Sequence, residues 1–364
     1  MEKVRLGDIA SFSKGKQINV SNLISNGKYD FLNGGINPSG KWNDFNVNEN
    51  SIAISEGGNS CGYVNFMKNK FWCGAHCYYL YDVKLNIKYL YYNLKANEKK
   101  IQKLRSGACM PNIKKKDLYD FEIWYLSDKS EQEKIVKQLD KVQEIIDLRK
   151  KQIEELDNLI KVQFVDMFED ENNWNEVTLN DIAIKITDGE HGTVPRVDNG
   201  KLYLMARNIT TSNTIDLSEV SYIPEENHRK IYKRCNPEKN DLLLVCVGAT
   251  VGKVALVPEM EEFSIARSVA LIKPNKKVIS SLYLLSLMNS DYMQSQIKNC
   301  VHAAAQAGLY TNMIKELKFK LPPIELQNKF AVFVNQINKQ KFILGKSLKE
   351  TEDLQESLMN KYFN

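Results

Sequence analysis

Apolar residues near the C-terminal end of the chain recur with alternating spacings of four and three positions. This spacing places them in one stripe along an α-helix, the heptad pattern of a coiled coil. The stretch 325–363 has no proline and one glycine, Gly345, so we predict a helix of about 38 residues, or about 57 Å at about 1.5 Å per residue. The stripe consists of apolar Phe330, Val334, Ile337, Leu344, Leu348, Leu358 and Tyr362 and polar Lys341, Thr351 and Gln355.

A second stretch in the middle of the chain has the same pattern. Its stripe consists of Ile135, Leu139, Val142, Ile146, Ile153, Leu156, Ile160 and Met167, with Arg149 and Gln163 at polar positions. The residues before the two helices also correspond, because a leucine and a glutamine stand at both starts: Leu126 with Gln132, and Leu321 with Gln327. A helix with one apolar stripe needs a partner, so we predict an antiparallel pair. This pair is either only a structural core or a spacer that holds two other parts at a fixed separation.

The repeat extends into the segments before each helix. Val4–Ala10 resembles Val177–Ala183, and the glycine turns at 58–62 and 248–252 each stand between segments typical of strands. We therefore predict an α+β protein with a pseudo-twofold internal repeat, in which two similar α/β domains are joined by two long antiparallel coiled-coil helices. The expected boundaries are 1–125 for the first domain, 126–168 for the first helix, 169–320 for the second domain and 321–364 for the second helix. Dimeric DNA-binding proteins present two reading elements with the same two-fold geometry.

Polar loops rich in glycine occur in both domains. They carry the residue types that contact base edges in DNA, although each could also be an ordinary surface turn. In the first domain the candidate DNA-binding residues are Lys16, Gln17, Asn33, Asn37, Lys41, Asn59, His76, Arg105 and Lys114. In the second domain they are His191, Thr193, Arg196, Arg207, Asn208, Lys253, Arg267, His302 and Gln306.

Composition narrows the class of protein. With 364 residues, 26% charged and 43% hydrophobic, the chain suits a globular protein of more than one domain. No apolar run is long enough to span a membrane, the N-terminal residues lack the apolar core of a signal peptide, and the seven cysteines are odd in number; we expect reduced thiols in the cytoplasm. Cys61, Cys73, His76 and Cys77 do not follow a zinc-binding pattern, so we predict no metal site. The net charge of +5 weakly favours a polyanionic partner.

Motifs for catalysis are missing from the sequence. Gly248–Lys253 resembles a phosphate-binding loop but is one residue short, and Val254 stands where Ser or Thr is needed. The sequence contains no Asn/Asp-Pro-Pro-aromatic motif of adenine methyltransferases, no Gly-x-Gly-x-x-Gly loop and no His-Glu-x-x-His pair. We therefore predict no catalytic residues and no cofactor in this chain, which selects a target and does not transform it.

Taken in order, these features resemble the specificity (S) subunit of type I restriction–modification systems. The resemblance rests on the two Val-x-Leu-x-Asp-Ile-Ala starts, the loop Asp188–His191, the glycine turns at Gly58 and Gly248, and the start of the second helix at Pro322. The first domain departs from the pattern, since it lacks the Asp188–His191 type of loop and has Ser127-Asp128 in place of Pro322-Pro323.

The resemblance implies two target-recognition domains that read the two halves of an asymmetric sequence in double-stranded DNA. It also implies a complex with two methyltransferase (M) subunits, which carry S-adenosylmethionine and methylate adenine. Restriction (R) subunits that use ATP and Mg would complete a restriction enzyme. Two alternatives remain at this point: a coiled-coil scaffold that binds no DNA, and an enzyme that acts on DNA by itself.

Overall fold

The computed structural model describes residues 2–107, 111–168, 173–303 and 308–364. The chain divides into two compact units. The first comprises Met1–Gln152 and Leu344–Asn364, and the second comprises Ile153–Ile343. Each unit therefore contains one globular part and one segment of each long helix.

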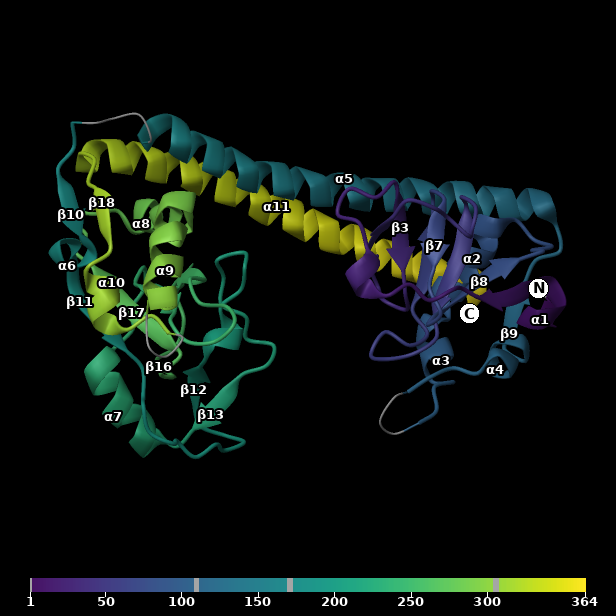
Figure 1. Cartoon of the computed structure of the whole chain (residues 1–364), viewed down its shortest axis with the longest axis horizontal. Coiled ribbons are helices and arrows are strands. Elements are labelled where there is room, and N and C mark those ends of the chain that lie inside the picture. The colour runs from purple at the N-terminus through teal and green to yellow at the C-terminus, as the bar shows by residue number, and fades with distance from the viewer. Residues whose placement is uncertain (1, 108–110, 169–172, 304–307) are drawn as a thin grey trace. The chain divides into compact units, whose positions relative to one another are not determined.

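The globular part of the first unit contains a run of short strands followed by three short helices (Figure 1). In chain order these are β1 (Glu2–Arg5), α1 (Leu6–Ile9), β2 (Ser11–Lys14), η1 (Val20–Asn22), β3 (Tyr29–Leu32), β4 (Gly40–Trp42), β5 (Ser51–Ser55), β6 (Val64–Met67), β7 (Phe71–Cys73), β8 (Cys77–Tyr81), α2 (Ile87–Ala96), α3 (Glu98–Gln102), α4 (Lys115–Tyr119) and β9 (Glu122–Tyr125). They form a four-stranded sheet, β2-β8-β5-β6, a three-stranded sheet, β4-β3-β7, and the pair β1-β9.

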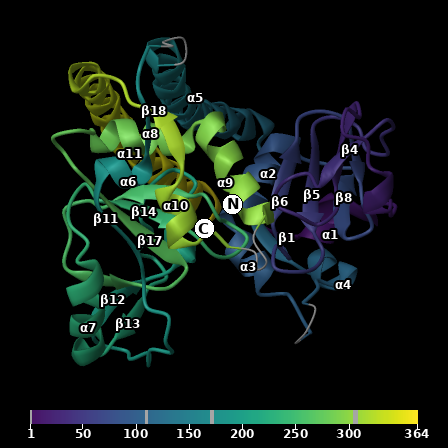
Figure 2. The ribbon, with the colours of Figure 1, turned by 60° about the vertical axis from the view of Figure 1, so that its left-hand side comes forward.

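The second unit repeats this plan with two differences: it has an additional helix, α7, and its 3-10 helix follows β12, whereas η1 precedes β3. Its elements are β10 (Glu176–Thr178), α6 (Leu179–Ile182), β11 (Ala183–Asp188), β12 (Lys201–Leu204), η2 (Ala206–Asn208), β13 (Ser221–Ile223), α7 (Glu225–Cys235), β14 (Leu242–Val245), β15 (Val254–Leu256), β16 (Phe263–Ile265), β17 (Val269–Pro274), α8 (Ser281–Asn289), α9 (Asp291–Ala303), α10 (Thr311–Lys315) and β18 (Lys318–Lys320). The sheet orders are β11-β17-β14-β15, β13-β12-β16 and β10-β18; Figure 2 shows β14 beside β17. The predicted internal repeat is confirmed.

One of the two inner strands of each four-stranded sheet, β5 or β14, is covered on both faces. In β14, Leu242 and Leu244 belong to one hydrophobic cluster, whereas Leu243 and Val245 belong to another. In β5, Ile52 and Ile54 point into one cluster and Ala53 into the other. Successive side chains of a strand point to opposite faces, so a strand between two cores needs a continuous apolar run. The run in β14 therefore reflects burial on both sides.

Glycines with positive φ form the turns that follow these strands. Gly58 and Gly62 have φ angles of 75° and 86°, and Gly248 and Gly252 have φ angles of 106° and 95°. L-residues with a side chain rarely adopt this conformation. The antiparallel pairs β5-β6 and β14-β15 on either side confirm the predicted strand, glycine turn and strand in both units.

The two long helices are α5 (Lys129–Phe168) and α11 (Ile324–Phe363), each of 40 residues. In the first unit, the early part of α5 contacts the late part of α11, since Arg149 donates a hydrogen bond to the carbonyl oxygen of Ser347 at 2.7 Å. In the second unit, the late part of α5 contacts the early part of α11, through an ion pair between Asp157 and Lys341. The helices are therefore antiparallel, as predicted.

Four of the five polar positions in the predicted stripes have partners on the opposite helix, whereas Gln163 donates to Asp166 on its own helix. Arg149 donates to Thr351, which is buried, and Gln355 donates to Gln143 at 2.9 Å. Lys341 is the polar position that pairs with Asp157. A polar side chain in a coiled-coil seam costs less when a specific partner satisfies it, and it also fixes the register of the helices.

One buried glutamine anchors the start of each long helix to its domain. Gln132 donates to the carbonyl oxygen of Leu126 at 2.7 Å and accepts from the backbone N–H of Asn86 at 3.1 Å. Gln327 donates to the carbonyl oxygen of Pro322 at 2.8 Å and accepts from the backbone N–H of Ser280 at 2.9 Å. The two glutamines occupy corresponding places, which explains why this residue stands at both helix starts.

Across the described part of the chain, no helix is both long enough and apolar enough to cross a membrane.

Candidate nucleic-acid interface

Four loops of the first unit gather at one end of its two sheets. The backbone N–H of Lys16, after β2, donates to the carbonyl oxygen of Cys73 at 2.9 Å, and the indole N–H of Trp72 donates to the carbonyl oxygen of Lys16 at 2.8 Å. The side chains of Lys16 and Gln17 remain exposed. The loop after β2 therefore lies against the end of β7.

The loop after β3 is fixed against the residues that precede β8. The backbone N–H of His76 donates to the Asn33 side-chain oxygen at 3.2 Å. Gly34 has φ of 84°, and a Cβ atom there would lie 2.6 Å from the carbonyl oxygen of His76. The hydroxyl of Ser60 donates to the carbonyl oxygen of Gly34, which joins the 58–62 turn to the same cluster. The loops that carry Asn33, Asn37, Asn59 and His76 are thus brought together.

The segment before α4 adds two further candidates. The backbone N–H of Gly58 donates to the carbonyl oxygen of Pro111 at 3.0 Å, and Ser106 pairs with Asn112. Arg105 and Lys114 are exposed at the two ends of this segment. Burial raises the pKa of the nearby Cys61 thiol, and the Arg105 charge partly opposes this shift. Arg105 therefore lies close to the glycine turn.

Glu56, which was not among the residues predicted from the sequence, contacts side chains beneath the glycine turn of this loop cluster. Its side chain forms an ion pair with Lys14 and accepts a hydrogen bond from the Tyr78 hydroxyl at 3.5 Å. Burial, together with the Glu56 charge, raises the pKa of Tyr78 to about 12. Only the short glycine turn that follows Glu56 could have drawn attention to it in the sequence.

In the second unit, the loop 188–192 is fixed to the end of β16. The backbone N–H of Glu190 donates to the carbonyl oxygen of Ile265 at 3.0 Å, and the backbone N–H of Arg267 donates back to Glu190 at 3.0 Å. A Cβ atom on Gly189 would lie 2.2 Å from the carbonyl oxygen of Ile265. The loop approaches β16 so closely that only glycine fits at position 189. The same contacts bring His191 and Arg267 into one region.

Charged groups hold this loop in place. The His191 ring nitrogen Nε2 lies 2.6 Å from the Asp188 carboxylate. Arg234, on α7, donates to the carbonyl oxygen of Gly189 and lies 3.9 Å from the Glu190 carboxylate. Sequence reasoning missed Arg234, because α7 has no counterpart in the first unit. The arrangement presents a preformed loop with its histidine half exposed.

Arg196, Arg207 and Asn208 already have partners within the second unit. The Arg196 guanidinium lies 4.4 Å from the ring centroid of Tyr203, and Arg207 donates to the Ser221 hydroxyl at 2.9 Å. Asn208 is buried, and within the described residues its amide makes hydrogen bonds only to backbone groups. The Arg196 side chain remains exposed, whereas Asn208 supports the loop after η2.

The glycine turn 248–252 lies next to Arg267. The Cys246 thiol donates to the carbonyl oxygen of Arg267 at 3.2 Å, and Gln294 of α9 donates to the carbonyl oxygen of Gly252 at 3.0 Å. Lys253, at the end of this turn, is half-buried. Four predicted residues complete the set: Lys41 is exposed on β4 of the first unit, Thr193 is exposed on the 189–200 loop, His302 is exposed near the end of α9, and Gln306 lies outside the described residues.

Comparison with known proteins identifies the family. A family model described as the type I restriction modification DNA specificity domain matches residues 1–158 and 171–352. The chain belongs to this family. The two matched regions correspond to the two halves of the repeat, and membership makes the chain a DNA-recognition subunit. A coiled-coil scaffold that binds no DNA is not favoured.

Several similar proteins are named as specificity subunits of type I systems. A protein of Mycoplasma pneumoniae named as a type I specificity subunit is 37% identical over 163 residues, or 44% of this chain and 41% of that protein. One of Mycoplasma genitalium with the same kind of name is 24% identical over 99% of this chain and 93% of its own length. The specificity subunit of the type I restriction enzyme EcoBI of Escherichia coli is 28% identical over 52% of this chain and 41% of its own length.

Solved structures share the fold. The crystal structure of a type I restriction–modification S subunit from M. genitalium gives a TM-score of 0.60 at 23% identity, over 100% of this chain and 96% of that chain. A chain from a study of complex assembly in a type I restriction–modification system gives 0.53 at 13% identity, over 99% and 97%. The α+β fold with two domains and two long antiparallel helices is thereby confirmed.

Proposed function

We propose that this chain reads a bipartite, asymmetric sequence in double-stranded DNA, with residues 1–125 and 169–320 each reading one half-site. The observation that carries the proposal is that the two units have the same sheet framework and different loops at the same end of it. The loops after β2 and β11 occupy corresponding places and make the same backbone contact, since the N–H of Lys16 donates to Cys73 at the end of β7 and the N–H of Glu190 donates to Ile265 at the end of β16. The first of these loops carries Lys16 and Gln17, whereas the second carries Glu190 and His191. Different side chains on one framework would read different bases.

The exposed members of the two loop clusters are the proposed base and backbone contacts. They are Lys16, Gln17, Asn37, Asn59, His76, Arg105 and Lys114 in the first domain, and His191, Thr193, Arg196, Arg207, Arg267 and His302 in the second. Arginine, lysine, asparagine and glutamine side chains form the bidentate hydrogen bonds that distinguish bases in the major groove. Loops fixed by buried glycines would lose little conformational entropy on binding.

The chain would act as the non-catalytic subunit of a larger complex in the cytoplasm. We expect it to bind two M subunits, which would carry S-adenosylmethionine, and R subunits that use ATP and Mg where these are present. Apolar side chains off the coiled-coil seam support protein partners, since Phe342 is 76% exposed, Ile343 66% and Leu148 54%. Large exposed apolar side chains on helices are typical of protein interfaces.

Methylation-aware sequencing tests the proposal most directly. The chain is expressed with its cognate M subunit in a host that lacks adenine methylation, and the methylated sites are compared with those made by either protein alone. We expect one bipartite sequence to be methylated only when both are present. Methyl transfer by the purified chain alone, or methylation without sequence preference in its presence, would refute the proposal.

A further inference from the structure

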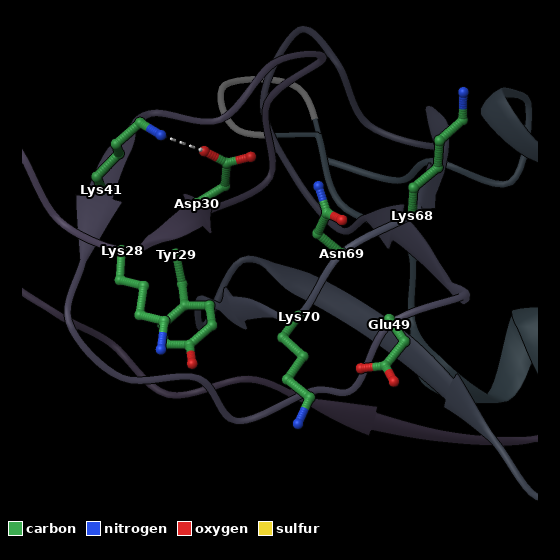
Figure 3. Close-up of a pocket in the computed structure, with 8 residues that line it drawn as sticks. All are labelled: Lys28, Tyr29, Asp30, Lys41, Glu49, Lys68, Asn69 and Lys70. Carbon is green, nitrogen blue, oxygen red and sulfur yellow. Dashed lines mark ion pairs between the residues drawn. The ribbon is translucent and has the colours of Figure 1, made fainter.

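A hollow in the first unit is lined mainly by lysines and lies outside the loop cluster described above. Its volume is about 440 Å³. We call it the lysine hollow; its charged residues are Lys28, Lys41, Lys68, Lys70, Asp30 and Glu49. They come from the starts of β3 and β7, from β4 and from the turn before β5 (Figure 3). Four ammonium groups against two carboxylates leave the hollow positively charged.

Most of these lysines are not neutralised by the protein. Lys41 lies 3.5 Å from the Asp30 carboxylate, with both side chains about half exposed, and such surface pairs are weak. Within the described residues, Lys28, Lys68 and Lys70 form no ion pair. Like charges held together repel one another, so a site of this kind is stabilised when an anion binds.

Aromatic rings position two of the ammonium groups. The Lys70 Nζ lies 4.5 Å from the ring centroid of Phe45, and the Lys28 Nζ lies 5.3 Å from that of Tyr29. The two rings are 5.1 Å apart. Cation–π contacts of this kind hold lysines in place without neutralising their charge. The ammonium groups therefore remain available to an outside anion.

The orientation of the lysines indicates an extended anion. Figure 3 shows Lys41, Lys68 and Lys70 directed away from one another around the hollow, and not toward one common point. A pocket for a single phosphate ion would have converging donors. A polyanion that carries successive phosphates needs ammonium groups spread along its path.

The internal repeat shows that the fold does not require these lysines. In both units the first residue of the third strand of the small sheet is a phenylalanine with an equivalent partner: Phe71 pairs with Asp30, and Phe263 pairs with Leu202. In this register, Glu262 stands where the first unit has Lys70, and Met260 stands where it has Lys68. The same framework thus carries an acidic residue in the second unit, so the lysines serve something outside the fold.

The hollow also lies at a suitable distance from the proposed base-reading loops. Asp30 of the hollow lies in β3, and Asn33 of the loop cluster directly follows this strand. The two residues are three positions apart, so about 10 Å separates them along the strand at about 3.3 Å per residue. The major groove of B-DNA is about 12 Å wide. A duplex with its groove at the loop after β3 would therefore have a phosphate strand within reach of the hollow.

We propose that the lysine hollow binds the sugar-phosphate backbone of the DNA beside the half-site read by the first domain. This inference rests on the proposed function, because the ligand is the same duplex. The hollow would contribute affinity and register without base specificity. The second domain would lack this contact, so the two domains would hold their half-sites unequally.

Salt dependence of DNA binding tests the inference. The complex with the M subunit is titrated with a labelled duplex that contains the methylated target, at several salt concentrations. The double variant Lys68→Gln/Lys70→Gln should lose two phosphate contacts. Its plot of log affinity against log salt should therefore be less steep than the wild-type plot, with a slope smaller in magnitude by about 1.8. Between about 50 and 200 mM salt, the wild-type affinity should then fall by a factor about 12 times larger than the affinity of the variant. The methylated sequence should not change.

Two matched variants control for effects other than charge. Lys68→Arg/Lys70→Arg keeps both charges and should keep the wild-type slope. Glu49→Gln removes a carboxylate from the hollow and should tighten DNA binding, the opposite of the lysine variants. Circular dichroism and assembly with the M subunit are measured for each, and Lys70→Glu, which copies the second unit's residue, should fold normally.

The outcomes separate the two proposals. If the wild-type complex binds its target and Lys68→Gln/Lys70→Gln leaves the slope unchanged, the hollow proposal is wrong and the proposed function stands. If the Gln variant loses assembly with the M subunit instead, the hollow binds protein and the proposal is also wrong. If the wild-type complex shows no salt-dependent binding to any duplex, both proposals fail.

Discussion

Replacing Gln327 with alanine should destabilise the second unit by far more than an ordinary substitution on α11. Gln327 is 0% exposed at the start of this helix. Its amide donates to the carbonyl oxygens of Pro322 and Val278, at 2.8 and 3.3 Å, and its oxygen accepts from the backbone N–H of Ser280 at 2.9 Å. The side chain thereby joins the start of α11 to the start of α8.

The magnitude follows from the groups left without partners. Alanine would leave one backbone N–H and two carbonyl oxygens with lost hydrogen bonds, and each buried unsatisfied group costs about 1–3 kcal/mol. Part of this free-energy cost would be recovered, because water could enter the space left by the side chain and because each carbonyl oxygen can accept a hydrogen bond through its second lone pair. We therefore expect the free energy of unfolding to fall by about 2–4 kcal/mol, with the urea midpoint lowered by about 1 M or more.

Urea unfolding of the intact chain, followed by circular dichroism, measures the effect. Gln336→Ala is the matched control, because Gln336 lies on the same helix, is exposed and has the same side chain; its effect should stay within about 0.5 kcal/mol. Gln132→Ala, at the corresponding place in the first unit, should resemble Gln327→Ala. If Gln327→Ala and Gln336→Ala unfold at the same urea concentration, the anchoring role assigned to the buried glutamines is incorrect.

Three further predictions concern DNA recognition. His191→Ala or Arg267→Ala, assayed in the M complex at fixed salt, should each weaken target binding by about 1–3 kcal/mol if the side chain contacts a base; neutral results at both would remove them from the proposed interface. Exchange of residues 1–125 for those of another family member should change one half of the methylated sequence, and a change in both halves would contradict separate reading. Insertion of four residues after Lys151, together with four before Leu344, should lengthen the spacer between the two half-sites by one base pair. Each helix gains about 6 Å in length and a net rotation of about 40°, and the rotation matches the rotation of about 35° and rise of about 3.4 Å that one additional base pair gives to DNA. An active variant with an unchanged spacer would contradict the spacer role of the helices.

The paired design of that insertion depends on the contacts between the helices. Arg149 with Ser347 and Asp157 with Lys341 lie on either side of the insertion points. Four extra residues in α5 alone would force one of these layers out of register, whereas matched insertions in both helices preserve them. Four residues are also close to a whole number of helical turns, so the apolar stripe of each helix still faces the other helix after the insertion. Only the local winding of the coiled coil changes.

The sequence alone determined the features that depend on local spacing. Heptads with polar Arg149 and Thr351 predicted two long helices, and the glycines at 58 and 248 predicted two tight turns. The recurrence of these signals in the same order predicted the repeat. Periodicity and glycine conformation are properties of the chain itself, so they are visible before any tertiary contact is known.

Tertiary structure decided which polar residues face outward and which support the fold. Asn208 and His191 look equally suitable as base contacts in the sequence, yet the Asn208 amide is used by backbone groups that lie 8 and 11 residues further along the chain. Arg234 and Glu56 gain their roles only when distant segments meet. The lysine hollow likewise appears only when the strand order β4-β3-β7 brings Lys41, Lys28 and Lys70 together. Such roles depend on which segments pack together, because a polar side chain satisfies whichever partner the fold places within hydrogen-bonding distance.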